Sequence, residues 1–296
     1  MSKNNLVILF KSLDSEESKK NDDLSLVLSS RGIETRIVSP LVFKKVHGPA
    51  LHLALEHIHK LRLDGLHCAI VVTSPRAAQI LADEIVIGGI FTKVADETLL
   101  PIFTSGFRTA SVLRDVMKAN GPALQVISPS DDDKGEGGGS GALIPQLRSF
   151  FSEKVQGKKV LFVRGDRALR AVPDALSEDG IAVDEVIVYE SAPETPLNLR
   201  MSCSSSVVIQ GEKRSPSALV FYSPSGLEAV LAANCEDLNM PLSGLGDNKQ
   251  NAAAIIAIGS TTAAALESKG FRVTGVAETP GHISLADIIC KTLITT

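Results

Sequence analysis

Four short turns, rich in hydroxyl groups and small side chains, have the composition of an anion-binding site. Two are Ser-Pro steps, at Ser74-Pro75 and Ser223-Pro224, and two are Gly-led turns, at 106–109 and 259–262. Each follows an apolar run and precedes a helix-like segment, so its backbone N–H groups would lie at the positive end of a helix. Carboxylates and phosphates bind there, and the pattern therefore indicates a polyanionic ligand.

The same turns also satisfy purely structural needs. Ser before Pro is a good N-cap followed by the residue best suited to a first helical turn. For Ser74 taken alone, a well-capped helix is the favoured explanation. The Gly-rich stretch at 131–141 is acidic and lacks the Gly-Lys-Ser/Thr ending of a phosphate loop, so it is expected to be a surface loop.

The four turns belong to an internal duplication of the sequence. Ser223 follows Ser74 by 149 residues and Gly259 follows Gly106 by 153, about half of the 296-residue chain. Apolar runs at 6–10 and 160–163 are each followed by a helix-like segment, a Gly-Ile step and a β-branched run. Repeats of this kind predict two related α/β units.

The apolar runs are short and continuous, as expected of strands that are covered on both faces of a parallel sheet. They alternate with helix-like segments, which predicts parallel sheets with right-handed crossovers. In such sheets ligands bind at the carboxyl ends of the strands, where all four turns would lie. The polar, Ser-rich stretch at 201–217 is expected to be a loose excursion.

The composition excludes several classes of function. The apolar fraction of 44% can supply two cores, while a net charge of −4 and a pI near 5.9 give no bulk attraction to nucleic acid or to an anionic membrane. The apolar runs are shorter than the roughly 18 residues of a membrane span, and the N-terminus has no secretory or transit pattern. We therefore expect a cytoplasmic protein without nucleic-acid or membrane partners.

The histidines and cysteines do not predict a metal site. Five of the six histidines lie within 47–67, but none are spaced as a His-x3-His pair. The four cysteines are far apart and form no Cys-x2-Cys pair, so buried, reduced thiols are expected. We predict no metal site.

Several motifs together resemble the uroporphyrinogen-III synthase family. They are TSPRA at 73–77, FYSPSGL at 221–227, IAIGSTTAAAL at 256–266, Val-Tyr-Glu at 188–190 and Ala-Glu-Thr-Pro at 277–280. The resemblance covers nearly the whole chain. It implies a cofactor-free lyase of haem biosynthesis that cyclises hydroxymethylbilane, a linear tetrapyrrole with eight carboxylates, and inverts the last pyrrole ring through a spiro intermediate.

The resemblance also assigns roles to residues. Tyr189 matches the family's interdomain tyrosine, which implies that it hydrogen-bonds or protonates the leaving hydroxyl; the alternative is a tyrosine that only packs. Arg108 is a weaker candidate for contact with a carboxylate. The predicted substrate-binding residues are Ser74, Arg76, Thr109, Arg164, Ser223, Ser225, Gly226, Thr261 and Thr262.

The implied fold has two similar domains, each a parallel β-sheet flanked by helices, joined by a two-stranded linker. Mapped onto this chain, one domain is 1–36 plus 195–296, the other is 47–185, and the linkers are 37–46 and 186–194. We expect a monomer.

One alternative is a two-domain clamshell protein that binds a small polyanion without catalysis, although the absence of Trp and the presence of only two Tyr speak against it. A nucleotide-binding enzyme is disfavoured because no GxGxxG or Walker loop follows any expected strand.

Overall fold

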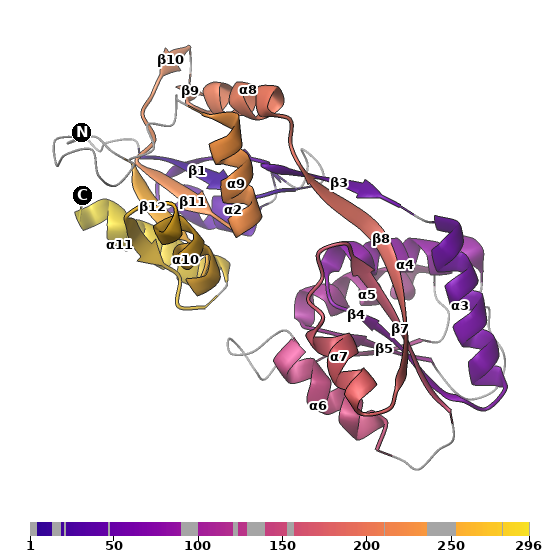
Figure 1. Ribbon diagram of the computed structural model, residues 1–296. Coiled ribbons are helices and arrows are strands. Elements are labelled where there is room, and N and C mark those ends of the chain that lie inside the picture. Colours follow the sequence, from indigo (N-terminus) through magenta and orange to yellow (C-terminus); the bar gives the residue numbers. More distant parts are fainter. Residues whose placement is uncertain are drawn as a thin grey trace. The chain divides into compact units, whose positions relative to one another are not determined.

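The computed structural model describes residues 5–13, 19–20, 22–46, 48–89, 100–120, 124–128, 140–152, 157–209, 211–235, 253–279 and 281–295. The chain forms two compact units (Figure 1). Unit 1 comprises Met1–Val42 and Ala192–Thr296, and unit 2 comprises Phe43–Ser191. Unit 2 is thus inserted into unit 1, and strands β3 (Leu41–Lys45) and β8 (Ala182–Pro193) carry the chain out and back.

Unit 1 is built on a five-stranded parallel sheet in the order β13-β12-β11-β1-β2. The strands are β1 (Leu6–Phe10), β2 (Glu34–Val38), β11 (Ala218–Phe221), β12 (Ala254–Ala257) and β13 (Val273–Val276). The helices are α2 (Asp23–Ser30), α8 (Pro196–Ser206), α9 (Pro224–Ala233), α10 (Ser260–Ser268) and α11 (His282–Thr295), and a hairpin of β9 (Val208–Ile209) and β10 (Glu212–Lys213) follows α8.

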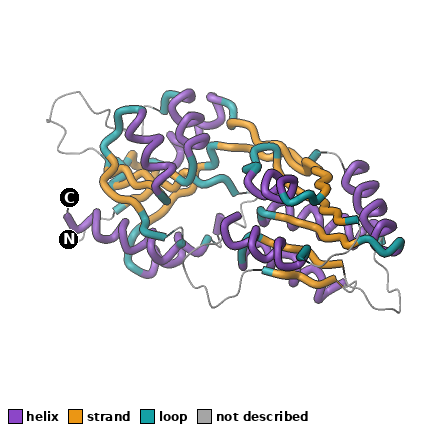
Figure 2. Tube along the Cα trace, turned by 60° about the horizontal axis from the view of Figure 1, so that its bottom comes forward, coloured by secondary structure: helices purple, strands orange, loops and turns teal. Residues whose placement is uncertain are grey.

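Alternate residues of β1 enter two different cores. Ile8 and Phe10 face α8, α9 and α10, while Val7 and Leu9 face α2 and α11. All five residues of β1 are buried because helices cover both faces of the sheet (Figure 2). This two-sided burial explains the unbroken apolar run in the sequence.

Unit 2 has a six-stranded sheet in the order β3-β8-β7-β4-β5-β6. Its remaining strands are β4 (His67–Val72), β5 (Leu100–Thr104), β6 (Leu124–Ile127) and β7 (Lys158–Gly165). Ile70 and Val72 of β4 face α3 (Gly48–Leu63), α4 (Pro75–Gly88) and α5 (Phe107–Asn120), while Ala69 and Val71 face α6 (Ser140–Phe150) and α7 (Ala171–Glu178). The predicted α/β fold class is confirmed in both units.

The two sheets share one topology, which agrees with the predicted duplication. The strands β2-β1-β11-β12-β13 of unit 1 correspond to β8-β7-β4-β5-β6 of unit 2, whose sheet has β3 as an additional edge strand beside β8. Phe10 pairs with Phe221 in unit 1, and Val163 pairs with Val72 in unit 2. The order in which the chain adds strands reverses between β1 and β11 in unit 1 and between β7 and β4 in unit 2. Open α/β sheets bind ligands at such reversals, at the carboxyl ends of the strands.

The expectation of a loose excursion at 201–217 is wrong. This region contains most of α8 and the β9-β10 hairpin. Thr195 caps α8 by accepting from the backbone N–H of Asn198, and Pro196 occupies the first turn. Leu199 and Cys203, one turn apart, are fully buried in the unit 1 core. The Ser-rich surface of α8 obscured this narrow apolar face in the sequence.

The expected surface loop at 131–141 ends earlier than predicted, because α6 begins at Ser140. Residues 131–139 lie outside the described residues. Across the ranges that are described, no helix is both long and apolar enough to cross a membrane.

Candidate active site

Both Ser-Pro turns cap helices in the same way. Ser74 Oγ accepts from Ala77 N at 3.2 Å at the start of α4, and Ser223 Oγ accepts from Gly226 N at 3.1 Å at the start of α9. Ser225 Oγ lies 3.4 Å from Ser223 Oγ. The serine oxygens thus bind the first-turn N–H groups, and the hydroxyl protons remain as donors for a further acceptor.

Packing requires a residue without a side chain at Gly226. A Cβ on it would lie 3.1 Å from both Pro40 Cγ and Ser223 Oγ, closer than most real side-chain contacts. Its predicted place in the binding turn therefore coincides with a packing constraint inside unit 1.

The two Gly-led turns begin helices with buried threonines. Thr109 and Thr262 are each the third residue of their helix, α5 and α10, and each is almost fully buried. Thr261 is exposed. The N-cap of α10 is Gly259, which supplies no side-chain hydrogen bond, so this helix start keeps first-turn N–H groups that could face an anion.

Tyr189 lies beside the Ser74 turn in unit 2. Its Oη donates to Ser74 Oγ at 3.3 Å. The Phe43 ring meets the Tyr189 ring edge-on, with centroids 5.9 Å apart and planes at 79°. The Arg76 guanidinium carbon lies 3.3 Å from the Phe43 ring centroid and 5.4 Å from that of Tyr189. Three residues that the sequence predicted for the site, Ser74, Arg76 and Tyr189, are therefore neighbours.

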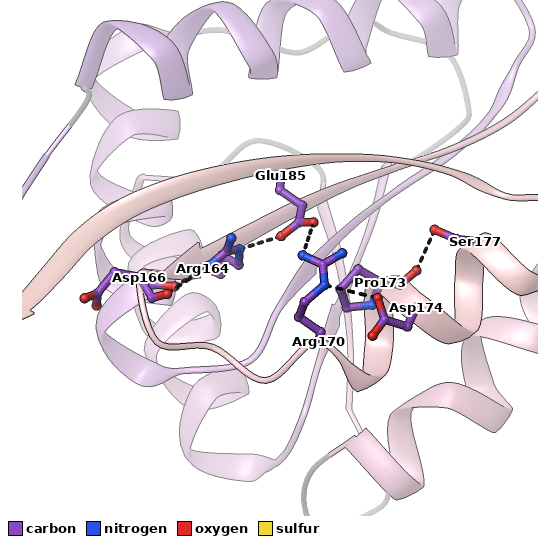
Figure 3. Close-up of polar contacts among 8 residues, drawn as sticks. Arg164, Asp166, Arg170, Pro173, Asp174, Ser177 and Glu185 are labelled. Carbon is purple, nitrogen blue, oxygen red and sulfur yellow. Dashed lines mark hydrogen bonds and ion pairs between the residues drawn. The ribbon is translucent and has the colours of Figure 1, made fainter. Parts of the chain in front are cut away.

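Arg164 is held within the protein at the end of β7. Its Nε donates to Glu185 Oε2 at 2.6 Å, and its Nη1 donates to the carbonyl oxygens of Gly165 and Asp166 at 3.0 and 3.2 Å (Figure 3). Glu185 also binds Arg170, and this hydrogen bond is the main cause that raises the pKa of Arg170. A substrate carboxylate would have to compete with Glu185 for Arg164.

A family model, described as uroporphyrinogen-III synthase HemD, matches residues 22–287. The chain belongs to the uroporphyrinogen-III synthase family. Family membership makes it an enzyme of tetrapyrrole synthesis, and the family's substrate is hydroxymethylbilane.

Solved structures of uroporphyrinogen-III synthases have a similar fold. A mutant enzyme from the extremely thermophilic bacterium Thermus thermophilus is 17% identical, with 99% of this chain and 100% of that chain covered and a TM-score of 0.53. The enzyme from Helicobacter pylori is 16% identical, with 97% and 99% covered and a TM-score of 0.54. At these identities the likeness shows the two-domain α/β fold alone.

In this uroporphyrinogen-III synthase family member, sequence reasoning missed the residues that surround Tyr189. Phe43 precedes the first helix of unit 2, and nothing in its sequence context pointed to the site. Gly165 and Asp166 come after Arg164 at the end of β7, at the place where an open parallel sheet binds ligands, and that position was an unused signal.

His52 and Cys68 have ordinary structural environments. His52 pairs with Glu56 and with Glu84, and over the part of the chain that the structure describes no three His, Cys, Asp or Glu side chains gather as metal ligands. Burial raises the pKa of the Cys68 thiol.

Proposed function

We propose that this chain converts hydroxymethylbilane into uroporphyrinogen III without a cofactor, as a cytoplasmic, monomeric lyase that releases one water molecule. The observation that carries this proposal is the family match over residues 22–287. The hydrogen-bonded pair of Tyr189 and Ser74, at the carboxyl edge of the unit 2 sheet, supports the proposal that a tyrosine hydroxyl is the proton donor.

The first step breaks the C–O bond of the hydroxymethyl group. The lone pair of the attached pyrrole nitrogen drives the hydroxyl out, and a proton delivered to the hydroxyl oxygen makes water the leaving group. This produces an electron-poor azafulvene. The substituted carbon of the last ring attacks it to form the spiro intermediate; fragmentation and reclosure at the free carbon then invert the ring, and loss of a proton restores the pyrrole.

Tyr189 is the proposed donor for the first step. Its hydroxyl donates to Ser74 Oγ, so a substrate hydroxyl near Ser74 could accept the same proton. Arg76 lies close to the ring of Tyr189. Positioned acids of this kind contribute roughly 10²- to 10⁴-fold in rate.

The helix-start turns are the proposed carboxylate sites. Unit 2 offers Ser74, Arg76 and Thr109; the corresponding list for unit 1 is Ser223, Ser225, Gly226, Thr261 and Thr262. Their hydroxyl and N–H groups can bind carboxylates, so the eight carboxylates of the substrate would not each need a Lys or Arg partner. Arg164 belongs to the proposal as a weaker site, since Glu185 already occupies its Nε. We assign the linkers to 37–46 and 186–194.

Positioning is the main catalytic task. Hydroxymethylbilane closes spontaneously to the uninverted isomer I, so the enzyme must hold the chain such that the substituted carbon attacks first. The isomer of the product therefore reports the function directly.

The test mixes the purified protein with freshly prepared hydroxymethylbilane, oxidises the products and separates the porphyrin isomers. We expect isomer III to dominate, at a rate proportional to protein concentration. Isomer I alone, at the rate of a protein-free control, would refute the proposed activity.

A further inference from the structure

Gly165, the last residue of β7, lies against the side chain of Tyr189. The two residues are partners across β7 and β8, next to an irregularity in register between Arg164 and Gly165. A Cβ built on Gly165 would lie 2.3 Å from Tyr189 Cζ and 2.6 Å from Tyr189 Oη. Real side chains do not tolerate such distances. The hydroxyl end of Tyr189 therefore occupies the space that any other residue at 165 would fill.

Asp166 holds the backbone that carries Tyr189. Its N–H donates to the carbonyl oxygen of Tyr189 at 3.0 Å. Its Oδ1 accepts from both the N–H and the hydroxyl of Ser191, each at 3.0 Å. One residue thus ties down β8 at Tyr189 and again two positions later, which restrains the direction in which the phenol points.

The turn that contains Gly165 and Asp166 is itself braced. Arg164 Nη1 donates to both of their carbonyl oxygens, and Glu185 fixes Arg164 from β8 (Figure 3). Because these contacts are made at consecutive residues, a change in the turn would be felt at the phenol.

From this geometry we propose that Gly165 and Asp166 are positioning residues, which hold the Tyr189 hydroxyl against Ser74 Oγ. Gly165 provides room for the phenol, and Asp166 sets the backbone from which it extends. Their importance for turnover rests on the proposed function of Tyr189 as a proton donor, since a donor acts only within hydrogen-bond reach of its acceptor.

The position of the phenol can be measured without any substrate. The chain has two tyrosines and no tryptophan, so protein labelled with ¹³C at tyrosine Cζ gives two side-chain resonances. Tyr189→Phe assigns them. We expect Gly165→Ala and Asp166→Ala to shift the Tyr189 resonance and to leave that of Tyr222 in place. An unchanged Tyr189 resonance in Gly165→Ala would overturn the proposal.

Two matched variants separate positioning from general damage. Gly275→Ala crowds a β-strand glycine in unit 1, where a Cβ would lie 2.9 Å from Ile288 Cγ1, so it controls for strain in the unit that does not contain Tyr189. Asp166→Asn keeps a side-chain oxygen that can accept from Ser191, and it should restore the wild-type resonance that Asp166→Ala loses.

Turnover supplies the second readout. We expect Gly165→Ala to lower kcat by roughly 10- to 100-fold with little change in KM, and to raise the share of isomer I. In the Tyr189→Phe background the same substitution should cost almost nothing more. A wild-type kcat in Gly165→Ala, or losses that multiply in the double variant, would overturn the role in turnover.

The tyrosine resonance and the turnover rate together show whether the positioning of Tyr189 or its proposed role as proton donor has failed. A shifted Tyr189 resonance together with a fully active Tyr189→Phe supports the positioning of the phenol and refutes its catalytic role. A shifted resonance with impaired Gly165→Ala, impaired Tyr189→Phe and active Gly275→Ala supports both.

Discussion

The two Ser-Pro turns occupy equivalent places in the two units but have different neighbours. In unit 2, Ser74 Oγ accepts from the Tyr189 hydroxyl, and in unit 1 the corresponding Ser223 Oγ lies near Ser225 Oγ. Both serines cap their helices with the same hydrogen bond. The capping turn is therefore the shared part of the duplicated fold, and in unit 2 the capping oxygen also accepts a hydrogen bond from a phenol.

The residues that follow the equivalent strands β1 and β7 extend the comparison. Lys11 follows Phe10 as Arg164 follows Val163, and each cation is bound by an acidic residue, Asp22 or Glu185. Lys11 lies near the ring of Tyr222 in unit 1, whereas the backbone beyond Arg164 supports Tyr189 in unit 2. Similar charges at the two switch points thus support different structures.

The largest expected effect comes from removal of the unit 2 phenol. Tyr189→Phe should lower kcat by roughly 10²-fold or more, because proton donation to the leaving hydroxyl is lost. The thermal midpoint should change little, because the ring and its contact with Phe43 remain. Steady-state kinetics with isomer separation measures the effect, and Tyr222→Phe is the matched control in unit 1. Equal activity of the two variants would remove the functional distinction between the units.

A smaller effect separates the two serines. Ser74→Ala and Ser223→Ala each remove an N-cap, and each should cost about 1 kcal/mol in the free energy of unfolding. Ser74→Ala also removes the acceptor for Tyr189 Oη, so it should lower kcat more than Ser223→Ala does. Denaturant unfolding and kinetics on the same samples make the comparison. If both variants lose stability and activity in equal proportion, Ser74 has no role beyond capping.

Much of this comparison was accessible from the sequence, because local patterns encode it. The apolar runs, the Ser-Pro caps and the offset between repeats predicted the sheets, the helix starts and their duplication. Helix α8 was missed because two buried residues, Leu199 and Cys203, are a weak signal within a Ser-rich segment. Phe43 and Gly165 were missed for a different reason. Their contacts with Tyr189 join different strands. Although Gly165 stands at a strand end, where open sheets bind ligands, no local pattern reports which side chain it meets.

The smallest expected effect uses the Cys68 thiol to compare the stability of the units. Cys68 is fully buried in β4 of unit 2, and burial raises its pKa. The unfolded chain therefore loses this proton at a lower pH than the folded chain does, and stability should fall as pH rises above about 8.5. The slope from one thiol is at most about 1.4 kcal/mol per pH unit, and it ends once pH exceeds the raised pKa.

Cys68→Ala should flatten this alkaline slope, measured by urea unfolding from about pH 7.5 to 9.5, a range that brackets the ordinary thiol pKa. Cys203→Ala makes the same comparison in unit 1, since Cys203 is equally buried there. Thiol labelling of the native wild-type protein adds a direct measure, because partly exposed Cys235 and Cys290 should react before either buried thiol. If Cys68 reacts as fast as Cys290, unit 2 opens readily near β4, and the Ser74 turn at the end of that strand would not be a rigid support for Tyr189.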